Sequence, residues 1–292
     1  MTTRQPIAIL TDSAALIAPA ETAGLPISLI NFNIIIQGQA FADVVGTEEQ
    51  LQPIFDRAAQ AQGVFKTAQT SRFIVEEHVH RLLTQYEQII YLCISPRLSG
   101  QYNSIKTLER TVAFKNRLFV VACYNASIGQ RHLVFKALKM VQSGKSCAAI
   151  IRFIKFADRK LIWTGVLIGD LSKLRRSGRM KLVFANLLER TNLKLMVLFN
   201  SRRFFVRRKV SDLCEVILKV YQRFHAHYKL RPRLVIAVTN TTAQQNHFRI
   251  INNFLHTHHI NHQITHQLAA SGALHSGINS VIFTVLAGQM LE

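Results

Sequence analysis

The sequence predicts a protein of two α/β domains, the first built on a parallel sheet with helices on both faces. Three observations carry this prediction: short apolar strands alternate with segments of helical spacing, polar turns follow those strands, and the alternation continues with a different composition after about residue 160. We therefore expect an N-terminal domain over residues 1–160 and a C-terminal α/β domain with a mixed sheet over residues 161–292. Because no low-complexity linker separates the two halves, we expect a packed interface with a ligand in the cleft between them.

In the N-terminal half, strand and helix patterns alternate along the chain. Short apolar runs predict strands at residues 7–10, 26–36, 89–94 and 118–123, and helical spacing predicts helices at residues 48–61 and 72–86. Polar turns follow three of the strands, at residues 11–13, 95–102 and 124–129. Since ligands of parallel α/β sheets bind outside the carboxyl ends of the strands, we expect these three turns to line one edge.

The C-terminal half has its own α/β elements. Its pattern predicts a strand at residues 161–168, a short helix with a basic turn at 170–180 and a hairpin at 193–205. An amphipathic helix at 211–228, a strand at 233–239, a helix at 243–256 and a last apolar element at 278–286 follow. No internal repeat is visible in the sequence.

Positive charge is concentrated in one part of the chain. Of the formal net charge of +20, residues 151–233 carry +16, from 21 Lys and Arg against 5 Asp and Glu. A field of one sign attracts polyanions whatever the fold. A solvated basic face explains this pattern equally well. The functional interpretation is that this region docks on nucleic acid, an anionic membrane surface or an acidic partner through Arg202, Arg203, Arg207 and Arg208.

Secretion and membrane insertion do not fit the sequence. The first apolar run, at residues 7–10, is too short for a signal peptide, and the longest charge-free apolar stretch, at residues 161–169, is too short to cross a bilayer. Four cysteines without CxxC spacing predict buried, reduced thiols. We therefore expect a cytoplasmic protein without stable membrane insertion.

The sequence also has no catalytic or metal-binding pattern. Five histidines lie within residues 256–266, without a carboxylate among them and without the spacing of a zinc site, which predicts a polar surface and no metal. The serines lack a GxSxG elbow, and neither GxGxxG nor a Walker loop is present. We therefore expect a protein that is not an enzyme, with no catalytic residues and no cofactor.

The turn at residues 95–102 joins a buried strand to a helix and contains Ser95, Ser99 and Gly100. Such a turn presents backbone N–H groups and the positive end of a helix dipole, so it suits an anion. A plain helix cap explains the same residues, because serine is a common N-cap. The turn alone leaves both interpretations open.

Six short motifs occur in an order and at a spacing that resemble the DegV family of bacterial fatty-acid-binding proteins. They are TDS (11–13), Asp43, TAQTS (67–71), SPRLSGQY (95–102), NASIG (125–129) and LSKLRRSGR (171–179). The resemblance covers nearly the whole chain. It implies two α/β domains with a long-chain fatty acid, such as palmitate, stearate or oleate, bound between them. It also implies a partner, a separate fatty acid kinase that phosphorylates the bound acid.

The resemblance further implies which residues hold the ligand. By position in the family motifs, Thr67 and either Ser95 or Ser99 would bind the carboxylate. Gly100 would let the backbone approach the ligand, and Arg179 would face the opening of the same site. Hydroxyl groups suit a carboxylate beside a hydrocarbon cavity, because they donate hydrogen bonds without a fixed ion pair. The apolar residues of the N-terminal half fit a lining for the acyl tail and a plain core equally well.

The chain departs from the family pattern near its C-terminus. Family members usually carry His-Thr-Gly-Pro-Gly there, with a histidine that helps to hold the carboxylate, whereas this chain has Leu268 in place of the histidine and Ser271 in place of the proline. Either His266 or His275 substitutes for the missing histidine, or the ligand binds differently and its phosphorylation is not supported. Smaller departures are Ala68, Gln101 and Ser177, where the family usually has serine, threonine and glycine.

We therefore expect a divergent DegV-like carrier that binds a long-chain fatty acid, with the carboxylate at the domain interface and the tail buried. The alternative is a basic regulatory or scaffold protein whose lipid site has decayed and which docks on nucleic acid or anionic membrane. An acyl chain that co-purifies with the protein favours the first, and a steep salt dependence of polyanion binding favours the second.

Overall fold

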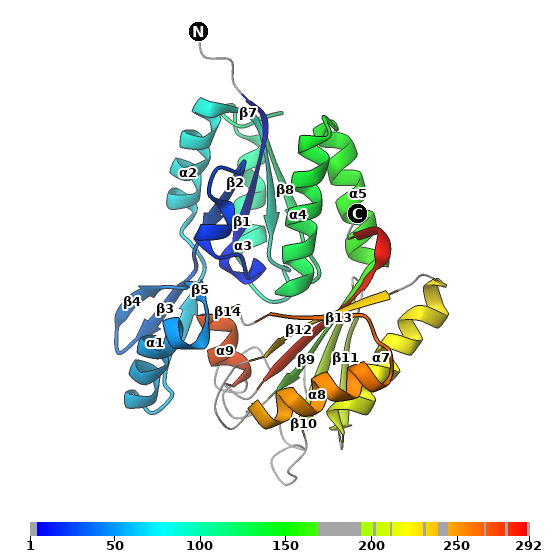
Figure 1. Ribbon diagram of the computed structural model, residues 1–292. Coiled ribbons are helices and arrows are strands. Elements are labelled where there is room, and N and C mark those ends of the chain that lie inside the picture. The colour runs from blue at the N-terminus through cyan, green and yellow to red at the C-terminus, as the bar shows by residue number, and fades with distance from the viewer. Residues whose placement is uncertain are drawn as a thin grey trace.

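A computed structural model describes residues 5–168, 194–200, 203–210, 212–229, 232–238, 245–265, 267–277 and 280–290. Two large sheets dominate the fold, with the N-terminal sheet at the top of Figure 1, the C-terminal sheet below it, and a smaller unit at the lower left beside their junction. This is the mixed α/β architecture that the sequence predicts.

The N-terminal sheet is parallel throughout. Its order is β2 (Ile27–Ile30), β1 (Gln5–Asp12), β7 (Tyr86–Cys93) and β8 (Leu118–Ala122). Tyr91 packs in a cluster with α2 (Arg72–Gln85) and α3 (Gln101–Lys106), whereas its neighbour Leu92 packs in a cluster with α4 (Ile128–Gln142) and α5 (Cys147–Lys160). Both faces of the sheet are buried, which explains why its strands are continuous apolar runs.

The three polar turns follow β1, β7 and β8, which are neighbours in this sheet. Parallel neighbours end at the same edge, and in Figure 1 this edge faces the C-terminal sheet. The prediction that the three turns line one edge is therefore confirmed.

The C-terminal sheet is mixed, as predicted. Its order is β11 (Arg203–Val210), β10 (Lys194–Asn200), β9 (Ile162–Ile168), β15 (Val281–Ala287), β12 (Pro232–Val238) and β13 (His262–Thr265). The pair β12–β13 is parallel and the other neighbouring pairs are antiparallel. The helices α7 (Leu213–Tyr228) and α8 (Gln245–Thr257) lie below this sheet in Figure 1, whereas α4 contacts β9, β12 and β15 from the N-terminal half.

A smaller unit combines segments from both halves of the chain. The antiparallel strands β4 (Gln39–Ala42), β3 (Asn33–Ile36) and β6 (Lys66–Ala68) accompany α1 (Glu48–Gln60). From the C-terminal half, β14 (Leu268–Ala269) pairs with β5 (Val45–Gly46), and α9 (Ala270–Ser276) follows it. Leu274 of α9 lies in one buried cluster with Ile34 and Leu51. The late part of the chain therefore returns to the N-terminal half.

The strand region expected at residues 26–36 is split between two sheets. Between β2 and β3, the Phe32 carbonyl accepts a hydrogen bond from Asp43 N at 2.8 Å, and the Asn31 carbonyl accepts one from Thr70 Oγ1 at 2.8 Å. Phe32 N donates to Ser13 Oγ at 3.3 Å. Because these backbone groups are satisfied outside a ladder, the chain crosses from one sheet to the other without leaving them unpaired.

The expected helices at residues 48–61, 72–86, 211–228 and 243–256 are confirmed as α1, α2, α7 and α8, with ends within two residues. The expected hairpin is β10–β11, although β11 continues to Val210. The short helix and basic turn expected at residues 170–180 lie outside the described residues, and the domain boundary near residue 160 stays a prediction. Short 3-10 helices are η1 (Ser13–Ala15), η2 (Pro19–Thr22), η3 (Thr107–Arg110) and η6 (Gly288–Met290).

The four cysteines, at positions 93, 123, 147 and 214, are buried and free of disulfides, as the spacing predicts. Within the described ranges, none of the helices combines the length and the apolar character needed to cross a bilayer.

Candidate functional site

A cavity lies between the two halves, at the edge where the three polar turns meet. Its volume is about 230 Å³, and residues from both halves line it. The apolar part of its wall comes from Leu16, Phe32, Ile94 and Leu98 of the N-terminal half and from Val166, Ile168, Val197, Phe199 and Ile282 of the C-terminal sheet. A cavity with mostly apolar walls suits a hydrocarbon group.

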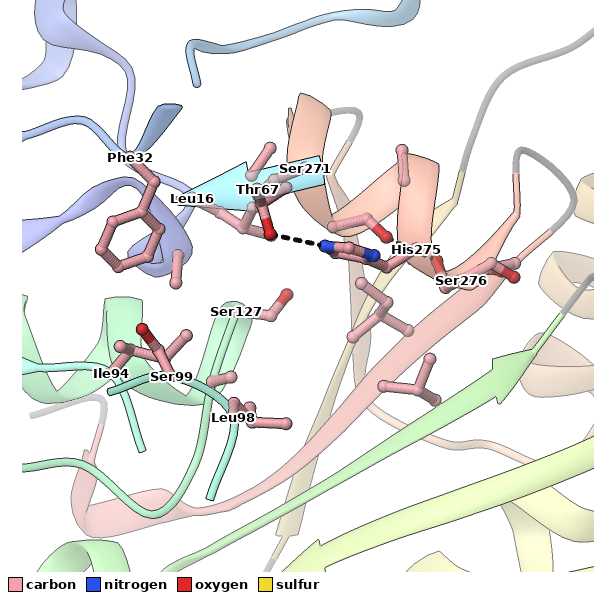
Figure 2. A pocket seen from close by; sticks show the side chains of 18 of the residues that line it. Leu16, Phe32, Thr67, Ile94, Leu98, Ser99, Ser127, Ser271, His275 and Ser276 are labelled. Carbon is pink, nitrogen blue, oxygen red and sulfur yellow. Dashed lines mark hydrogen bonds between the residues drawn. The ribbon is translucent and has the colours of Figure 1, made fainter. Parts of the chain in front are cut away.

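Two polar side chains from opposite halves meet in the wall of this cavity. Thr67 Oγ1 lies 3.0 Å from His275 Nε2, and both residues line the cavity. Figure 2 shows this pair above Ser127, with Ser99 and Leu98 lower in the view. The Phe65 ring lies 5.1 Å from the His275 ring, centroid to centroid. A hydroxyl and an imidazole side by side can hold a carboxylate next to an apolar wall.

Asp43 holds α9, and with it His275, against the N-terminal half. Its carboxylate accepts hydrogen bonds from Ser13 Oγ at 2.7 Å, from Ser271 N at 2.8 Å and from Ser271 Oγ at 2.7 Å. Burial raises the pKa of Asp43, although the hydrogen bonds from Ser271 and Ser13 lower it. The motif residue Asp43 therefore links the two halves, and Ser271 supplies two of its three donor groups.

The serine turn after β7 satisfies much of its own hydrogen bonding. The Ser95 carbonyl accepts bonds from Leu98 N and Ser99 N, and Ser95 Oγ accepts one from Arg97 N at 3.3 Å. Ser99 Oγ accepts a bond from Gln101 N at 3.2 Å, at the start of α3. Ser99 therefore holds the first residue of α3 through its hydroxyl oxygen, and it also lines the cavity.

Gly100 gives room to a neighbouring side chain. A Cβ atom at this position would lie 2.8 Å from Gln69 Oε1. Gln69 lines the cavity, and its Nε2 donates to Ser104 Oγ at 3.1 Å. Because Oε1 is the end of a flexible side chain and Gly100 has an ordinary φ of −71°, this contact does not by itself require a glycine.

A buried carboxyl group lies directly beneath the turn. Ile94 N donates to Asp12 Oδ2 at 2.7 Å, and Gln130 Nε2 donates to Asp12 Oδ1 at 3.0 Å. Burial raises the pKa of Asp12 to about 7, against the lowering effect of these hydrogen bonds. Asp12 thereby joins the carboxyl ends of β1 and β7 to the first turn of α4.

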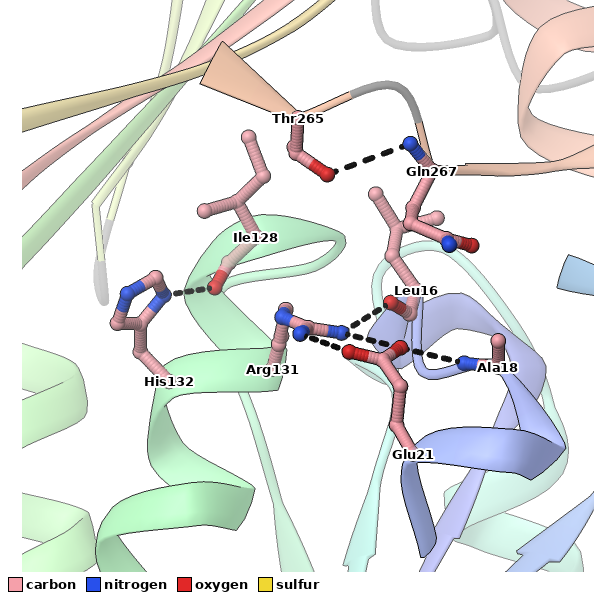
Figure 3. Close-up of polar contacts among 8 residues, drawn as sticks. All are labelled: Leu16, Ala18, Glu21, Ile128, Arg131, His132, Thr265 and Gln267. Carbon is pink, nitrogen blue, oxygen red and sulfur yellow. Dashed lines mark hydrogen bonds and ion pairs between the residues drawn. The ribbon is translucent and has the colours of Figure 1, made fainter. Parts of the chain in front are cut away.

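An ion pair fixes the segment after β1 over the cavity. Arg131 of α4 pairs with Glu21 and donates from Nη1 to the Leu16 carbonyl at 2.8 Å, as Figure 3 shows. Burial raises the pKa of Glu21, but the hydrogen bonds from Arg131 and Ala18 outweigh it and hold this pKa below its usual value. Leu16 is therefore held in the cavity wall by a contact with its backbone.

The sequence-predicted ligand residues fall into three groups. Thr67 and Ser99 line the cavity; Ser95 and Gly100 lie in the same turn but are not among the lining residues. Arg179 and His266 lie outside the described residues. Of the two histidines that could replace the family histidine, His275 lies in the cavity wall. Ser127 also lines the cavity, and its φ is positive at 59°. The sequence motif that contains it did not single it out as a ligand residue, and no local pattern signals the positive φ.

The cluster of histidines near residue 260 makes local contacts. His262 lies with Nδ1 2.8 Å from the Ile260 carbonyl and Nε2 2.9 Å from Asn252 Oδ1. In the part of the chain that the structure describes, no group of three His, Cys, Asp or Glu side chains is placed to hold a metal ion.

The fold and the cavity define a two-domain α/β protein with an apolar pocket at the junction of its sheets. The family model described as "Uncharacterised protein, DegV family" matches residues 6–287, so the chain belongs to the DegV family. A DegV domain-containing protein of Deinococcus radiodurans is 21% identical over 277 residues, which cover 94% of this chain and 96% of that protein. Protein UU535 of Ureaplasma parvum, also named a DegV domain-containing protein, is 24% identical over 62% of this chain, which spans only 59% of that relative's length.

Solved structures confirm the fold. DegV of Bacillus subtilis, described as a fatty acid binding protein, has a TM-score of 0.78 at 17% identity and covers 97% of this chain and 99% of its own. A DegV family protein of Thermus thermophilus, described by its fatty acid binding, has a TM-score of 0.79 at 19% identity with the same coverage. A stearic acid-binding protein of Eubacterium ventriosum has a TM-score of 0.78 at 14% identity and covers 99% of this chain and all of its own.

Proposed function

We propose that this chain binds a long-chain fatty acid, such as palmitate, stearate or oleate, with its tail in the cavity and its carboxylate near Thr67 and His275. The observation that carries the proposal is the apolar cavity between the halves with a polar pair in its wall. Each methylene buried there contributes about 0.8 kcal/mol, whereas the carboxylate requires hydrogen bonds to leave water. The fatty acid binding named for the solved relatives supports the same ligand class.

The proposed role is binding without catalysis, since the solved relatives are described as binding proteins. A fatty acid kinase is the partner that the family resemblance suggests, and the four buried thiols fit the expected cytoplasmic location. Incubation of the acyl-loaded protein with ATP and a fatty acid kinase tests the partnership, with acyl phosphate as the product to be detected.

Lipid analysis and thermal unfolding test the binding itself. Native mass spectrometry of the purified protein should show a bound acyl chain. Palmitate added to delipidated protein at 100 times its Kd should stabilise the fold by about 2.7 kcal/mol, because it binds the native state alone. Thr67→Val should bind palmitate about tenfold more weakly, and Thr67→Ser, which keeps the hydroxyl, should bind within about threefold of wild type. No bound lipid and no stabilisation by fatty acids of any length would overturn the proposal.

A further inference from the structure

Ser127 has a backbone conformation that L-amino acids rarely adopt. Its φ is 59° and its ψ is −130°, values close to the first central position of a type II′ turn, where glycine dominates. Gly129 N closes this turn on the Ala126 carbonyl at 3.2 Å. Ser127 N donates to the Ala14 carbonyl at 2.8 Å, so a contact with the N-terminal segment holds the strained residue in place.

The hydroxyl of Ser127 does not cap the helix that it precedes. A serine at an N-cap normally accepts a hydrogen bond from the backbone two or three residues later, but Ser127 makes no such bond with α4. Its oxygen is buried and has no hydrogen-bond partner among the described residues, and the residue is 9% exposed. Figure 2 shows this hydroxyl pointing into the space below Thr67 and His275. A buried hydroxyl is rarely left unpaired, so its position implies a partner inside the cavity.

The surroundings of Ser127 favour an anionic partner. Ala126 and Ser127 line the cavity at the N-terminus of α4, a helix of 15 residues, so the positive end of its dipole faces the cavity. Two other hydroxyls in the wall, by contrast, are bonded within the protein. Ser276 Oγ donates to the Gly272 carbonyl at 2.8 Å, and Thr164 Oγ1 lies 3.0 Å from Thr284 Oγ1.

We propose that the Ser127 hydroxyl donates a hydrogen bond to the carboxylate of the bound fatty acid, which approaches Thr67 and His275 from the other side. This inference rests on the proposed function and adds a third head-group ligand, supplied by α4. In this arrangement, the strained backbone of Ser127 turns its hydroxyl away from α4 and toward the ligand. Ser127 then favours an ionised acid over a neutral lipid of the same chain length, since hydrogen bonds to charged groups are stronger.

Competition with a fluorescent fatty acid measures the affinities of palmitate and of hexadecanol for four variants. Ser127→Ala and Ser127→Gly should bind palmitate about tenfold more weakly and hexadecanol less than threefold more weakly. Ser276→Ala is the matched control: it deletes a hydroxyl from the same wall that is already bonded to a carbonyl, and both affinities should stay within about threefold. Thr67→Val is the positive control and should weaken palmitate binding.

Ser127→Gly also distinguishes an effect on palmitate binding from an effect on the stability of the fold. Glycine adopts a positive φ without strain, so this variant should melt at a higher temperature than wild type without lipid, while binding palmitate more weakly. Wild-type palmitate affinity in both Ser127 variants, with weakened binding in Thr67→Val, would overturn the role of Ser127 and leave the proposed function intact. Equal loss of palmitate and hexadecanol would also overturn it, because Ser127 would then only shape the cavity. A wild-type protein that binds no palmitate would overturn the proposed function itself and this inference with it.

Discussion

Asp12 keeps a carboxyl group fully buried where the carboxyl ends of β1 and β7 meet the first turn of α4. Its pKa rises from 3.8 to about 7, mainly because burial disfavours the charged form. The folded protein therefore holds the proton of Asp12 more tightly than the unfolded chain does. A pKa that is raised on folding contributes stability at low pH, and this contribution is lost as the pH rises toward 7.

We expect the free energy of unfolding of the wild type to fall relative to that of Asp12→Asn between pH 4 and pH 7. A difference of about three pKa units lowers the free energy of unfolding of the wild type, relative to that of Asp12→Asn, by on the order of 4 kcal/mol. Urea denaturation of both proteins across this range measures the difference. Burial also raises the pKa of Asp158, to about 6, but this residue titrates in both proteins, so its effect cancels. Parallel pH profiles for the two proteins would contradict the assignment.

At the scale of the element, Gly165 explains how β9 fits into the centre of the C-terminal sheet. It lies opposite Leu198 on β10 and Phe283 on β15. The Phe283 ring covers the glycine so closely that a Cβ atom at residue 165 would lie 2.3 Å from Cζ of the ring. Phe283 is itself fully buried, so the ring has little room to move.

Gly165→Ala should therefore lower the free energy of unfolding by about 1–3 kcal/mol, as overpacking does in a tight core. Gly272→Ala in α9 is the matched control, because the nearest heavy atom to its added Cβ is 4.0 Å away. In a helix this change should be neutral or stabilise by up to about 1 kcal/mol. Urea denaturation compares the two variants, and equal stability of Gly165→Ala and wild type would show that Phe283 adjusts freely.

The cavity acquires its histidine, His275, through the placement of α9. The strand pair β14–β5 and the Asp43–Ser271 contacts hold α9 against the N-terminal half. His275 is carried on that helix and meets Thr67 across 208 positions of sequence. A short helix and a two-residue strand thus decide where the polar pair forms.

Across the whole molecule, positive charge is unevenly distributed along the chain. Residues 151–233 carry +16 of the net +20. Arg203, Arg207 and Arg208 lie on β11, which is one of the two edge strands of the C-terminal sheet among the described residues, and Arg202 lies outside those residues. Docking of this region on an anionic surface stays a prediction, separate from lipid binding.

Reversal of Arg202, Arg203, Arg207 and Arg208 to glutamate should abolish adhesion to vesicles that contain phosphatidylserine. Fatty acid affinity should stay unchanged, because surface charges are screened over about 8–10 Å at ordinary ionic strength. The control reverses four exposed basic residues outside residues 151–233, Arg110, Lys115, Lys139 and Lys145, and changes the net charge by the same amount. Co-sedimentation at two salt concentrations measures adhesion. Equal loss in both variants would mean that net charge alone drives adhesion, and a wild type that does not adhere would show the prediction to be wrong.

The α/β class, most of the helices and strands, and the shared edge of the three polar turns could be predicted from the amino-acid sequence. These features follow from local periodicity and from the rule that parallel neighbours end at one edge. The motif resemblance also determined the family and the ligand class to propose, and it singled out Thr67 and Ser99, which line the cavity.

How the two halves combine could not be predicted and is known from the three-dimensional structure. It split residues 26–36 between two sheets, returned β14 and α9 to the N-terminal half, and so placed His275 beside Thr67. It also gave Ser127 a positive φ that nothing in its own sequence requires. The physical reason is the same in each case: these arrangements depend on packing and hydrogen bonds between segments far apart in the chain, and a local pattern does not encode which distant segment will supply them.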